Sequence, residues 1–113
     1  MVVVYKLWQE YLPHFPKTSR YTLGAKIDEL LIEISELLCE ASYLSKGQKI
    51  PYIQRASTKL DMLKIFLQIA WEIGALSNHK LISLLEPIHE IGKMVGGWRK
   101  QVEKENPAER GAR

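Results

Sequence analysis

The 113-residue sequence contains a single cysteine and no long uncharged apolar run. A lone cysteine excludes a disulfide within the chain and is typical of a reducing compartment such as the cytoplasm. Crossing a bilayer takes about 20 consecutive apolar residues, and the chain has no such run. The N-terminal residues 1–8 also lack the basic start and the small-residue cleavage site of a signal peptide. These absences predict a cytoplasmic protein that does not enter a membrane.

The sequence also lacks the patterns that catalysis, metal binding and phosphate-loop binding require. His14, His79 and His89 are too scattered to share one helical face. Glu86 and His89 form one Glu-x-x-His spacing, whereas a di-iron bundle needs this motif twice and further carboxylates on facing helices. The glycines in residues 92–97 follow no strand and precede no Lys-Ser or Lys-Thr, so they do not indicate a phosphate loop. We therefore expect no enzymatic activity, no cofactor, no metal and no small-molecule substrate.

The cysteine and several glycines are better explained by packing than by chemistry. Cys39 lies on a helical pattern, where we expect a packed and inert thiol. Gly92 and Gly96 are one helical turn apart, which favours a close approach of two helices. Gly24 lies inside a helical pattern, where glycine costs about 1 kcal/mol relative to alanine. Its presence indicates a close backbone approach, either to another helix or to a ligand.

Apolar residues recur at spacings of three and four along most of the chain, and no segment alternates like a strand. A chain of this length forms one domain with one core. The pattern therefore predicts an all-α, up-down four-helix bundle over residues 1–105, with a short first helix and a flexible tail over residues 106–113. The expected helices run from about Val3 to Tyr11, from Ser19 to Leu44, from Pro51 to Gly74 and from Ser77 or Asn78 to Glu103.

Capping residues, glycine and proline set these expected boundaries. Residues 18–19, Thr-Ser, are suitable N-caps for the second helix. The segment 45–48, which contains a glycine, predicts a turn that ends this helix, and Pro51 suits the first turn of the next one. Pro87 removes the backbone N–H that would bond the Ser83 carbonyl, so we expect the fourth helix to be bent or interrupted there.

The third predicted helix is apolar on two nearly opposite sides. One stripe, from Ile53 to Ala70, has the spacing of a bundle core. A helix that is apolar around most of its circumference needs a second cover, and in a chain this short another copy of the chain is the best candidate. The alternative is a central helix covered by three neighbours of its own chain. The expected oligomer interface consists of Met62, Ile65, Phe66, Ile69 and Ile73.

The net charge of +3 is small, but the charges are unevenly distributed. Residues 28–40 contain five acidic residues and no basic one, whereas residues 46–64 contain five basic residues against Asp61 alone. Either neighbouring helices neutralise each other across the bundle, or a basic surface faces phosphates, with Arg55 and Lys59 at the rim of the oligomer interface. The candidate nucleic-acid or partner-binding residues are Lys17, Arg20, Lys26, Arg55, Lys59, Arg99, Lys100 and Lys104.

A series of short motifs occurs in a characteristic order over residues 5–100. These motifs are Phe15-Pro16-Lys17, Ser19-Arg20-Tyr21, Leu23-Gly24-Ala25-Lys26-Ile27, Lys59-Leu60-Asp61, Ile91-Gly92-Lys93-Met94 and Gly96-Gly97-Trp98. The sequence resembles a bacterial four-helix-bundle family that contains the Avd accessory proteins of diversity-generating retroelements. The same family contains relatives encoded in intervening sequences of large-subunit ribosomal RNA genes. Pro87 departs from this pattern, because the family's fourth helix runs on at that position.

The resemblance implies a more specific assembly and function than the residues alone. It implies a homo-oligomer, a pentameric barrel with a basic surface. It further implies binding to a reverse transcriptase and to nucleic acid, with RNA as the first candidate and DNA as the second. The protein would then be a non-enzymatic accessory factor in mutagenic cDNA synthesis. The alternative is a structural or protein-interaction bundle of the ribosomal-intervening-sequence type, without a nucleic-acid function.

Overall fold

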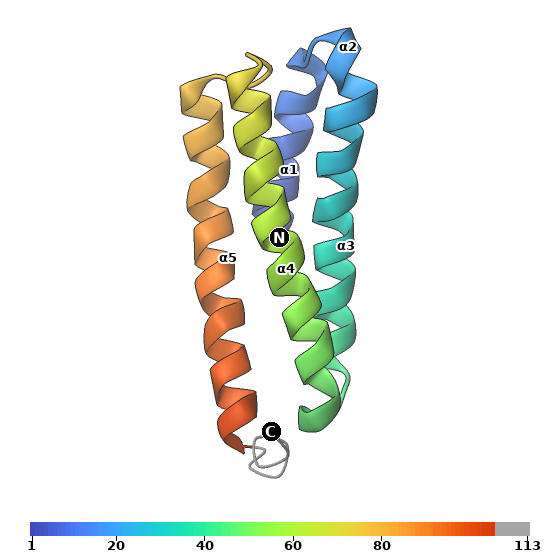
Figure 1. The fold of residues 1–113 in the computed structure, drawn as a ribbon, viewed down its shortest axis with the longest axis vertical. Helices are drawn as coiled ribbons and strands as arrows, with labels where there is room; N and C mark the ends of the chain where they lie inside the picture. Colours follow the sequence, from blue (N-terminus) through green and yellow to red (C-terminus); the bar gives the residue numbers. More distant parts are fainter. Residues whose placement is uncertain (106–113) are drawn as a thin grey trace.

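The computed structural model describes residues 1–105, and every regular element in that part of the chain is helical (Figure 1). The elements α2, η2 and α3 follow one another without a break, so four helical columns result. This confirms the all-α bundle, while the expected tail, residues 106–113, lies outside the described residues. In chain order the elements are α1 (Val2–Tyr11), the 3₁₀ turn η1 (Leu12–His14), α2 (Lys17–Ser19), the π turn η2 (Arg20–Gly24), α3 (Ala25–Ser42), α4 (Lys46–Glu72) and α5 (Asn78–Glu105).

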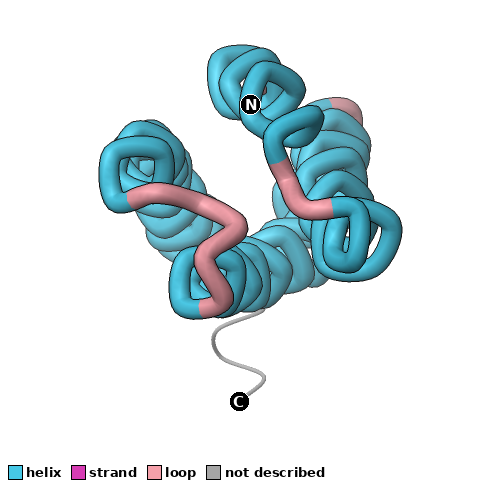
Figure 2. Tube along the Cα trace, turned by 90° about the horizontal axis from the view of Figure 1, so that it is seen from above, coloured by secondary structure: helices cyan, strands magenta, loops and turns pink. Residues whose placement is uncertain are grey.

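The columns alternate in direction around a common axis (Figures 1 and 2). Helix α4 packs along both α3 and α5, and α1 packs against α5 at the remaining corner. With 10 residues against the 28 of α5, α1 covers only the upper part of this corner in Figure 1. The bundle therefore has four helices at its upper end and three at its lower end.

The core consists of the apolar stripes that the spacing of three and four places on one side of each helix. Burying one such side chain contributes about 1.5–3 kcal/mol relative to leaving it exposed. These stripes correspond closely to the inner positions expected from the sequence. Fully or almost fully buried side chains include Ile27, Leu30, Leu31 and Ile34 of α3, Ile53, Leu60, Leu63 and Leu67 of α4, and Leu84, Ile88, Val95 and Val102 of α5.

Gly24 makes the close approach that its position in a helix indicates. A Cβ atom at Gly24 would lie 3.0 Å from Cδ1 of Leu12 and 3.6 Å from Cδ2 of Phe15. The neighbour is therefore the chain's own connection between α1 and α2, and not a ligand. Phe15 packs edge-on against Trp8, with ring centroids 5.3 Å apart. A larger residue at Gly24 would push this aromatic pair away from α3.

The N-terminus of the second helical column differs from the expectation. The helix begins at Lys17, directly after Pro16, and Ser19 is a buried residue within it instead of its N-cap. The Pro16 carbonyl accepts hydrogen bonds from the backbone N–H groups of Ser19 and Arg20, at 3.0 and 2.9 Å. Pro16 thus starts the helix through its carbonyl, which a search for side-chain caps does not detect.

The turn expected over residues 45–48 is wrong, because α4 begins at Lys46. Ser45 and Gln48 have the spacing of a capping box, in which residue N3 reaches back to the N-cap. The Gln48 Oε1 atom accepts a hydrogen bond from the Ser45 backbone N–H at 3.4 Å. This cap outweighs the presence of Gly47, so a segment that resembles a helix stop is a helix start.

Two further expectations concern the end of the third expected helix and the effect of Pro87 on the fourth. Helix α4 ends at Glu72, two residues before the expected end, and Gly74 adopts the left-handed conformation with φ of 80°. Helix α5 continues through Pro87, so the expected interruption there is wrong, and the bend stays a prediction. Proline removes one backbone hydrogen bond, whereas Leu84 and Ile88 on either side are buried in the core and hold the helix in place.

Two expectations about small residues are also wrong. A Cβ atom at Gly96 would meet nothing within 4 Å, because Gly96 is on an exposed side of α5. Gly92 is closer to α4, where its nearest neighbour would be the Lys64 Nζ atom at 3.9 Å. Cys39 is exposed instead of packed. In this part of α3, Ala41 is the buried residue that faces the core, and Cys39 lies on another side of the helix.

Asp28 of α3 is the polar connection between α1 and α3. Its carboxylate accepts hydrogen bonds from Trp8 Nε1 at 3.1 Å and from Gln9 Nε2 at 3.2 Å. The Tyr5 hydroxyl also donates to this carboxylate, which raises the pKa of Tyr5 above its usual value. Trp8 is completely buried, so Asp28 satisfies an indole N–H that water does not reach.

Asp28→Ala is expected to lower the free energy of unfolding by about 1–3 kcal/mol, the usual cost of a buried donor without a partner. Urea unfolding followed by circular dichroism measures this loss. Glu36→Ala is the matched control, because Glu36 is an exposed carboxylate on the same helix, and it should change stability by less than about 0.5 kcal/mol. Equal losses in the two variants would contradict the role given to Asp28.

Candidate interaction surfaces

The eight basic candidates lie in three separate places on the bundle (Figure 1). The group at residues 17–26 is at the upper end, where the second helical column begins. Arg55 and Lys59 are on the first half of α4, and the group at residues 99–104 is at the opposite end, in the last turns of α5. One copy of the chain therefore does not gather them into a single basic surface.

Only part of the upper group is available to a ligand. The Arg20 guanidinium group donates hydrogen bonds to the carbonyls of Pro13 at 2.8 Å and Phe15 at 3.1 Å, so it clamps the connection after α1. Lys26 forms an ion pair with Glu29 at 3.6 Å. Lys17 is exposed and is the member of the group best placed to contact a phosphate.

Tyr21 is a surface feature that the sequence reasoning missed. Its side chain is 77% exposed, and Lys17 precedes it by four residues on the same helical column. An exposed aromatic ring beside a cation suits base stacking together with a phosphate contact. The available signal was that Tyr21 falls outside the apolar spacing of the core.

The middle pair, Arg55 and Lys59, divides into two different roles. Lys59 forms an ion pair with Glu33 of α3, and both side chains are about 30% exposed. The hydrogen bond from Lys59 holds the pKa of Glu33 below its usual range, although desolvation acts in the opposite direction. Arg55 is exposed, with its guanidinium group 5.6 Å from the ring centroid of Tyr52. Neighbouring helices thus neutralise each other at Lys59, whereas Arg55 is available to a ligand.

The basic group at the end of α5 is likewise divided. The Arg99 Nε atom bonds Glu103 Oε1 at 3.2 Å within the same helix. Lys100 and Lys104 are exposed. Trp98, next to this group, packs partly against the core and lies under the Lys49 ammonium group, which is 5.1 Å from its ring centroid. Its ring is therefore occupied by the bundle's own contacts.

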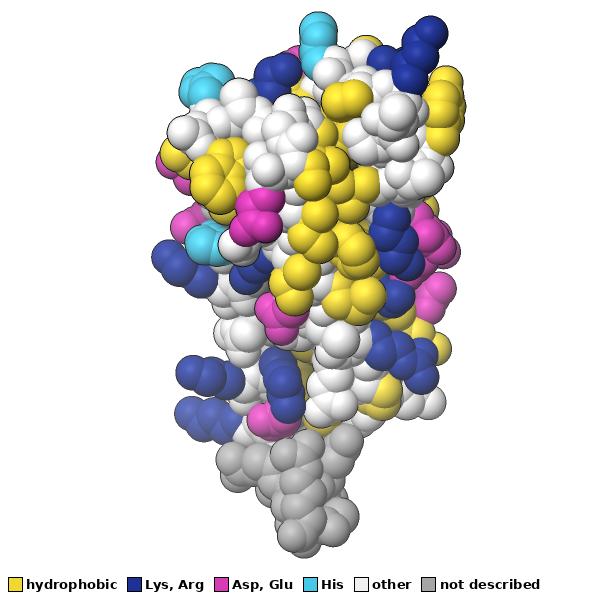
Figure 3. Space-filling view, turned by 45° about the horizontal axis from the view of Figure 1, so that its top comes forward, with side chains coloured by type: hydrophobic (Ala, Val, Ile, Leu, Met, Phe, Trp, Pro, Cys, Tyr) yellow, Lys and Arg dark blue, Asp and Glu magenta, His cyan; other side chains and the backbone are white. Residues whose placement is uncertain are grey.

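The outer apolar residues of α4 form a stripe that the rest of residues 1–105 leaves largely uncovered. Ile65, Ile69 and Ile73 are 59%, 38% and 57% exposed, whereas Met62 and Phe66 pack partly against the core. Figure 3 shows a yellow band of apolar side chains on this face of the molecule. The alternative to an oligomer is that three neighbours from the same chain cover α4. Within residues 1–105 they do not, because these side chains stay exposed, so this alternative is wrong. We call these five residues the α4 stripe.

Residues 1–105 contain neither a metal-ligand cluster nor a helix suited to span a membrane. In residues 1–105, no three histidine, cysteine, aspartate or glutamate side chains lie close enough to hold a metal ion. None of the helices there combines the length and the apolar character needed for a membrane span.

The family model of bAvd-like proteins matches residues 3–102, from the start of α1 to the last turns of α5. The chain belongs to the bAvd-like family. Comparisons with curated proteins and with solved structures gave no match. Several residues that carry the sequence resemblance have structural roles in this bAvd-like bundle, since Phe15, Arg20 and Gly24 together build the joint between α1 and α3.

Replacing Lys59 and Arg55 separately should show their different roles. Lys59→Ala is expected to lower the free energy of unfolding by about 0.5–1 kcal/mol, because it removes a partly buried ion pair. Arg55→Ala should change it by less than about 0.5 kcal/mol. Urea unfolding at neutral pH measures both effects.

The effect of Lys59→Ala should also depend on pH. The pKa of Glu33 is lower in the folded than in the unfolded chain, so its stabilisation is fully present above the unfolded-state pKa. This stabilisation is lost as the pH falls through the folded-state pKa. The difference between wild type and Lys59→Ala should therefore shrink in acid, and a difference independent of pH would contradict the pairing.

Proposed function

We propose that this bAvd-like protein is a non-enzymatic accessory factor of a diversity-generating retroelement in the cytoplasm. It binds the reverse transcriptase and nucleic acid, and so supports mutagenic cDNA synthesis from a template RNA. The observation that carries this proposal is the family match over residues 3–102, which includes almost the whole described bundle. The parts of the proposal that concern the retroelement, the reverse transcriptase and the RNA rest on the resemblance of the sequence to Avd.

The α4 stripe supports the part of the proposal that concerns assembly. Contiguous exposed apolar side chains usually mark an interaction site. In a homo-oligomer, here a pentameric barrel, a neighbouring copy covers the stripe. Arg55 lies on the same helix shortly before Met62, so a ring would repeat its positive charge once per copy. Such repetition produces a strong positive field from a weakly charged chain.

Ile65→Glu combined with Ile69→Glu should split this assembly and preserve the helical circular dichroism spectrum. The two side chains are exposed in the single chain, so their replacement disturbs the interface more than the core. Phe66→Glu is a weaker test, because Phe66 also packs against the core. Sedimentation velocity measures the assembly, and Ile82→Glu on α5, at a 55% exposed position, is the control. A wild-type protein that sediments as a monomer at micromolar concentration rules out the assembly.

Four exposed cations support contact with nucleic acid, and none of them has an ion-pair role described above. Contacts of this kind are made to phosphates and carry little base recognition. For single-stranded nucleic acid, each one contributes about 0.7 to the slope of log affinity against log salt concentration. Tyr21 adds a surface on which a base can stack. The four cations are Lys17, Arg55, Lys100 and Lys104.

Arg55→Gln should weaken binding to single-stranded RNA and lower the salt slope by about 0.7 for each copy in contact. Lys26→Gln is the matched control, because it removes the same charge from a residue already paired with Glu29. Fluorescence anisotropy over a salt series measures both variants, and a pull-down measures reverse transcriptase binding separately. Equal binding by wild type and Arg55→Gln would place the nucleic-acid site elsewhere.

One observation favours the alternative function, a structural or protein-interaction bundle without nucleic-acid binding. Lys26, Lys59 and Arg99 each pair with a carboxylate, and Arg20 bonds two carbonyls, so half of the eight basic candidates have internal partners. Genomic context distinguishes the two functions. A neighbouring reverse transcriptase gene with paired variable and template repeats supports the retroelement function, and their absence supports the alternative.

A further inference from the structure

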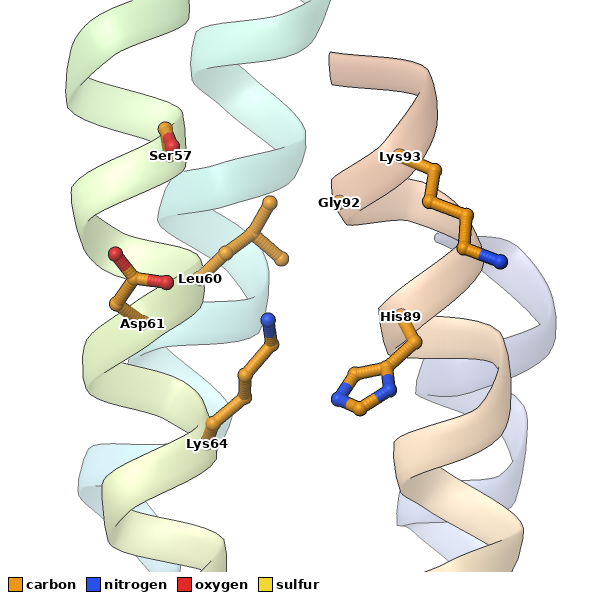
Figure 4. A pocket seen from close by; sticks show the side chains of 7 residues that line it. All are labelled: Ser57, Leu60, Asp61, Lys64, His89, Gly92 and Lys93. Carbon is orange, nitrogen blue, oxygen red and sulfur yellow. The ribbon is translucent and has the colours of Figure 1, made fainter. Parts of the chain in front are cut away.

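A groove between α4 and α5 contains none of the eight basic candidates and no residue of the α4 stripe. It has a volume of about 380 Å³ and is open to solvent along one side. Its α4 wall includes Ser57, Leu60 and Lys64, and its α5 wall includes His89 and Gly92 (Figure 4). The groove therefore combines cationic and hydroxyl groups with an apolar side chain.

The cationic groups are concentrated at one end of the groove. Lys64 and His89 point towards each other from the two walls (Figure 4). Lys64 is half-buried, and it has no ion-pair partner among residues 1–105. Asp61, one helical turn before Lys64, also lines the groove, while Lys93 points outwards and pairs with Glu90 at 3.5 Å. The Lys64 ammonium group thus faces a hollow that it shares with the Asp61 carboxylate, and the two form no ion pair.

Gly92 keeps this end of the groove open. A Cβ atom at this position would lie 3.9 Å from the Lys64 Nζ atom, so a longer side chain would fill the space in front of the ammonium group. Glycine inside a helix costs about 1 kcal/mol relative to alanine. A methyl group would fit here at ordinary contact distance, so close packing of α5 on α4 does not require a glycine. The absence of a side chain at Gly92 instead leaves the Lys64 ammonium group accessible to a ligand.

We infer that the α4–α5 groove binds a phosphodiester group of single-stranded RNA. Lys64 supplies the charge for the phosphate, and a ring N–H of His89 and the Ser57 hydroxyl supply hydrogen bonds. Leu60 also lines the groove but is almost fully buried, so the groove holds its ligand mainly through charge and hydrogen bonds. The groove is open along its side, so a nucleotide chain can enter and leave it. This inference rests on the nucleic-acid binding of the proposed function and adds a location for it.

Two pairs of variants test the groove with a short oligouridylate as the probe. Lys64→Gln removes the charge, and Lys6→Gln, which removes an exposed lysine on α1, is its control. Gly92→Leu fills the groove without changing the charge. Gly97→Leu is its control, because Gly97 is on α5 with nothing within 4 Å of its Cβ position. Thermal unfolding of each variant shows whether the bundle is intact.

Lys64→Gln should weaken binding about fourfold at physiological salt and lower the salt slope by about 0.7, the effect of one phosphate contact. Gly92→Leu should also weaken binding, whereas the two controls should bind like wild type. The oligouridylate should shift the NMR signals of the His89 ring in wild type and not in Lys64→Gln. If Gly92→Leu unfolds, the salt slope and the His89 signals of Lys64→Gln decide the test.

Three results would overturn the inference. If Lys64→Gln and Gly92→Leu bind like their controls while wild type binds RNA, the groove is not the site and the proposed function still stands. If inorganic phosphate shifts the His89 signals at the same concentration as the oligouridylate, the groove binds a free anion only. If wild type binds no RNA at low salt, both the groove and the proposed nucleic-acid function fail.

Discussion

The packing of α4 between α3 and α5 is the constraint on which the rest of this molecule depends. The inner residues of α4, from Ile53 to Ala70, are buried against both neighbours, and this fixes the positions of its other sides. The α4 stripe is left facing outwards on one side, and Lys64 faces the groove towards α5 on another. A helix with two long neighbours therefore presents two different faces to solvent, one apolar and one that carries Lys64.

The ion pairs and hydrogen bonds within the bundle reduce the number of basic residues that are available to bind a ligand. Lys59 joins α4 to the acidic α3, and Arg20 closes the connection between α1 and α2, so both contribute more to folding than to a surface field. The positive charge left for a ligand is smaller than the composition suggests, and it is spread over both ends of the bundle. Repetition in an oligomer is then the most direct way to concentrate it, because a single copy does not bring these residues together.

The sequence was sufficient to predict the fold class, the core and the family, because all three follow from apolar spacing and from the order of short motifs. It was less informative about boundaries. The capping box at Ser45 overrides Gly47, the Pro16 carbonyl starts a helix without a side-chain cap, and the helix tolerates Pro87 because its neighbours are buried. The candidate surfaces were predicted only in part. Whether Lys59 meets a carboxylate and whether Lys64 faces a hollow depend on how two helices are rotated against each other, which their separate periodicities do not determine.

The shortness of α1 has a consequence for how the bundle moves. Trp8 and Phe15 hold the upper end together across four helices, whereas the lower end has only α3, α4 and α5 around its core. Local opening in proteins begins where fewer apolar contacts must be broken. The amide hydrogens in the lower turns of α3 and α5 should therefore exchange with solvent through local openings, while those near Trp8 should exchange only when the whole bundle unfolds. The two ends of one small domain would thus differ in cooperativity, with the more mobile end carrying the exposed Lys100 and Lys104.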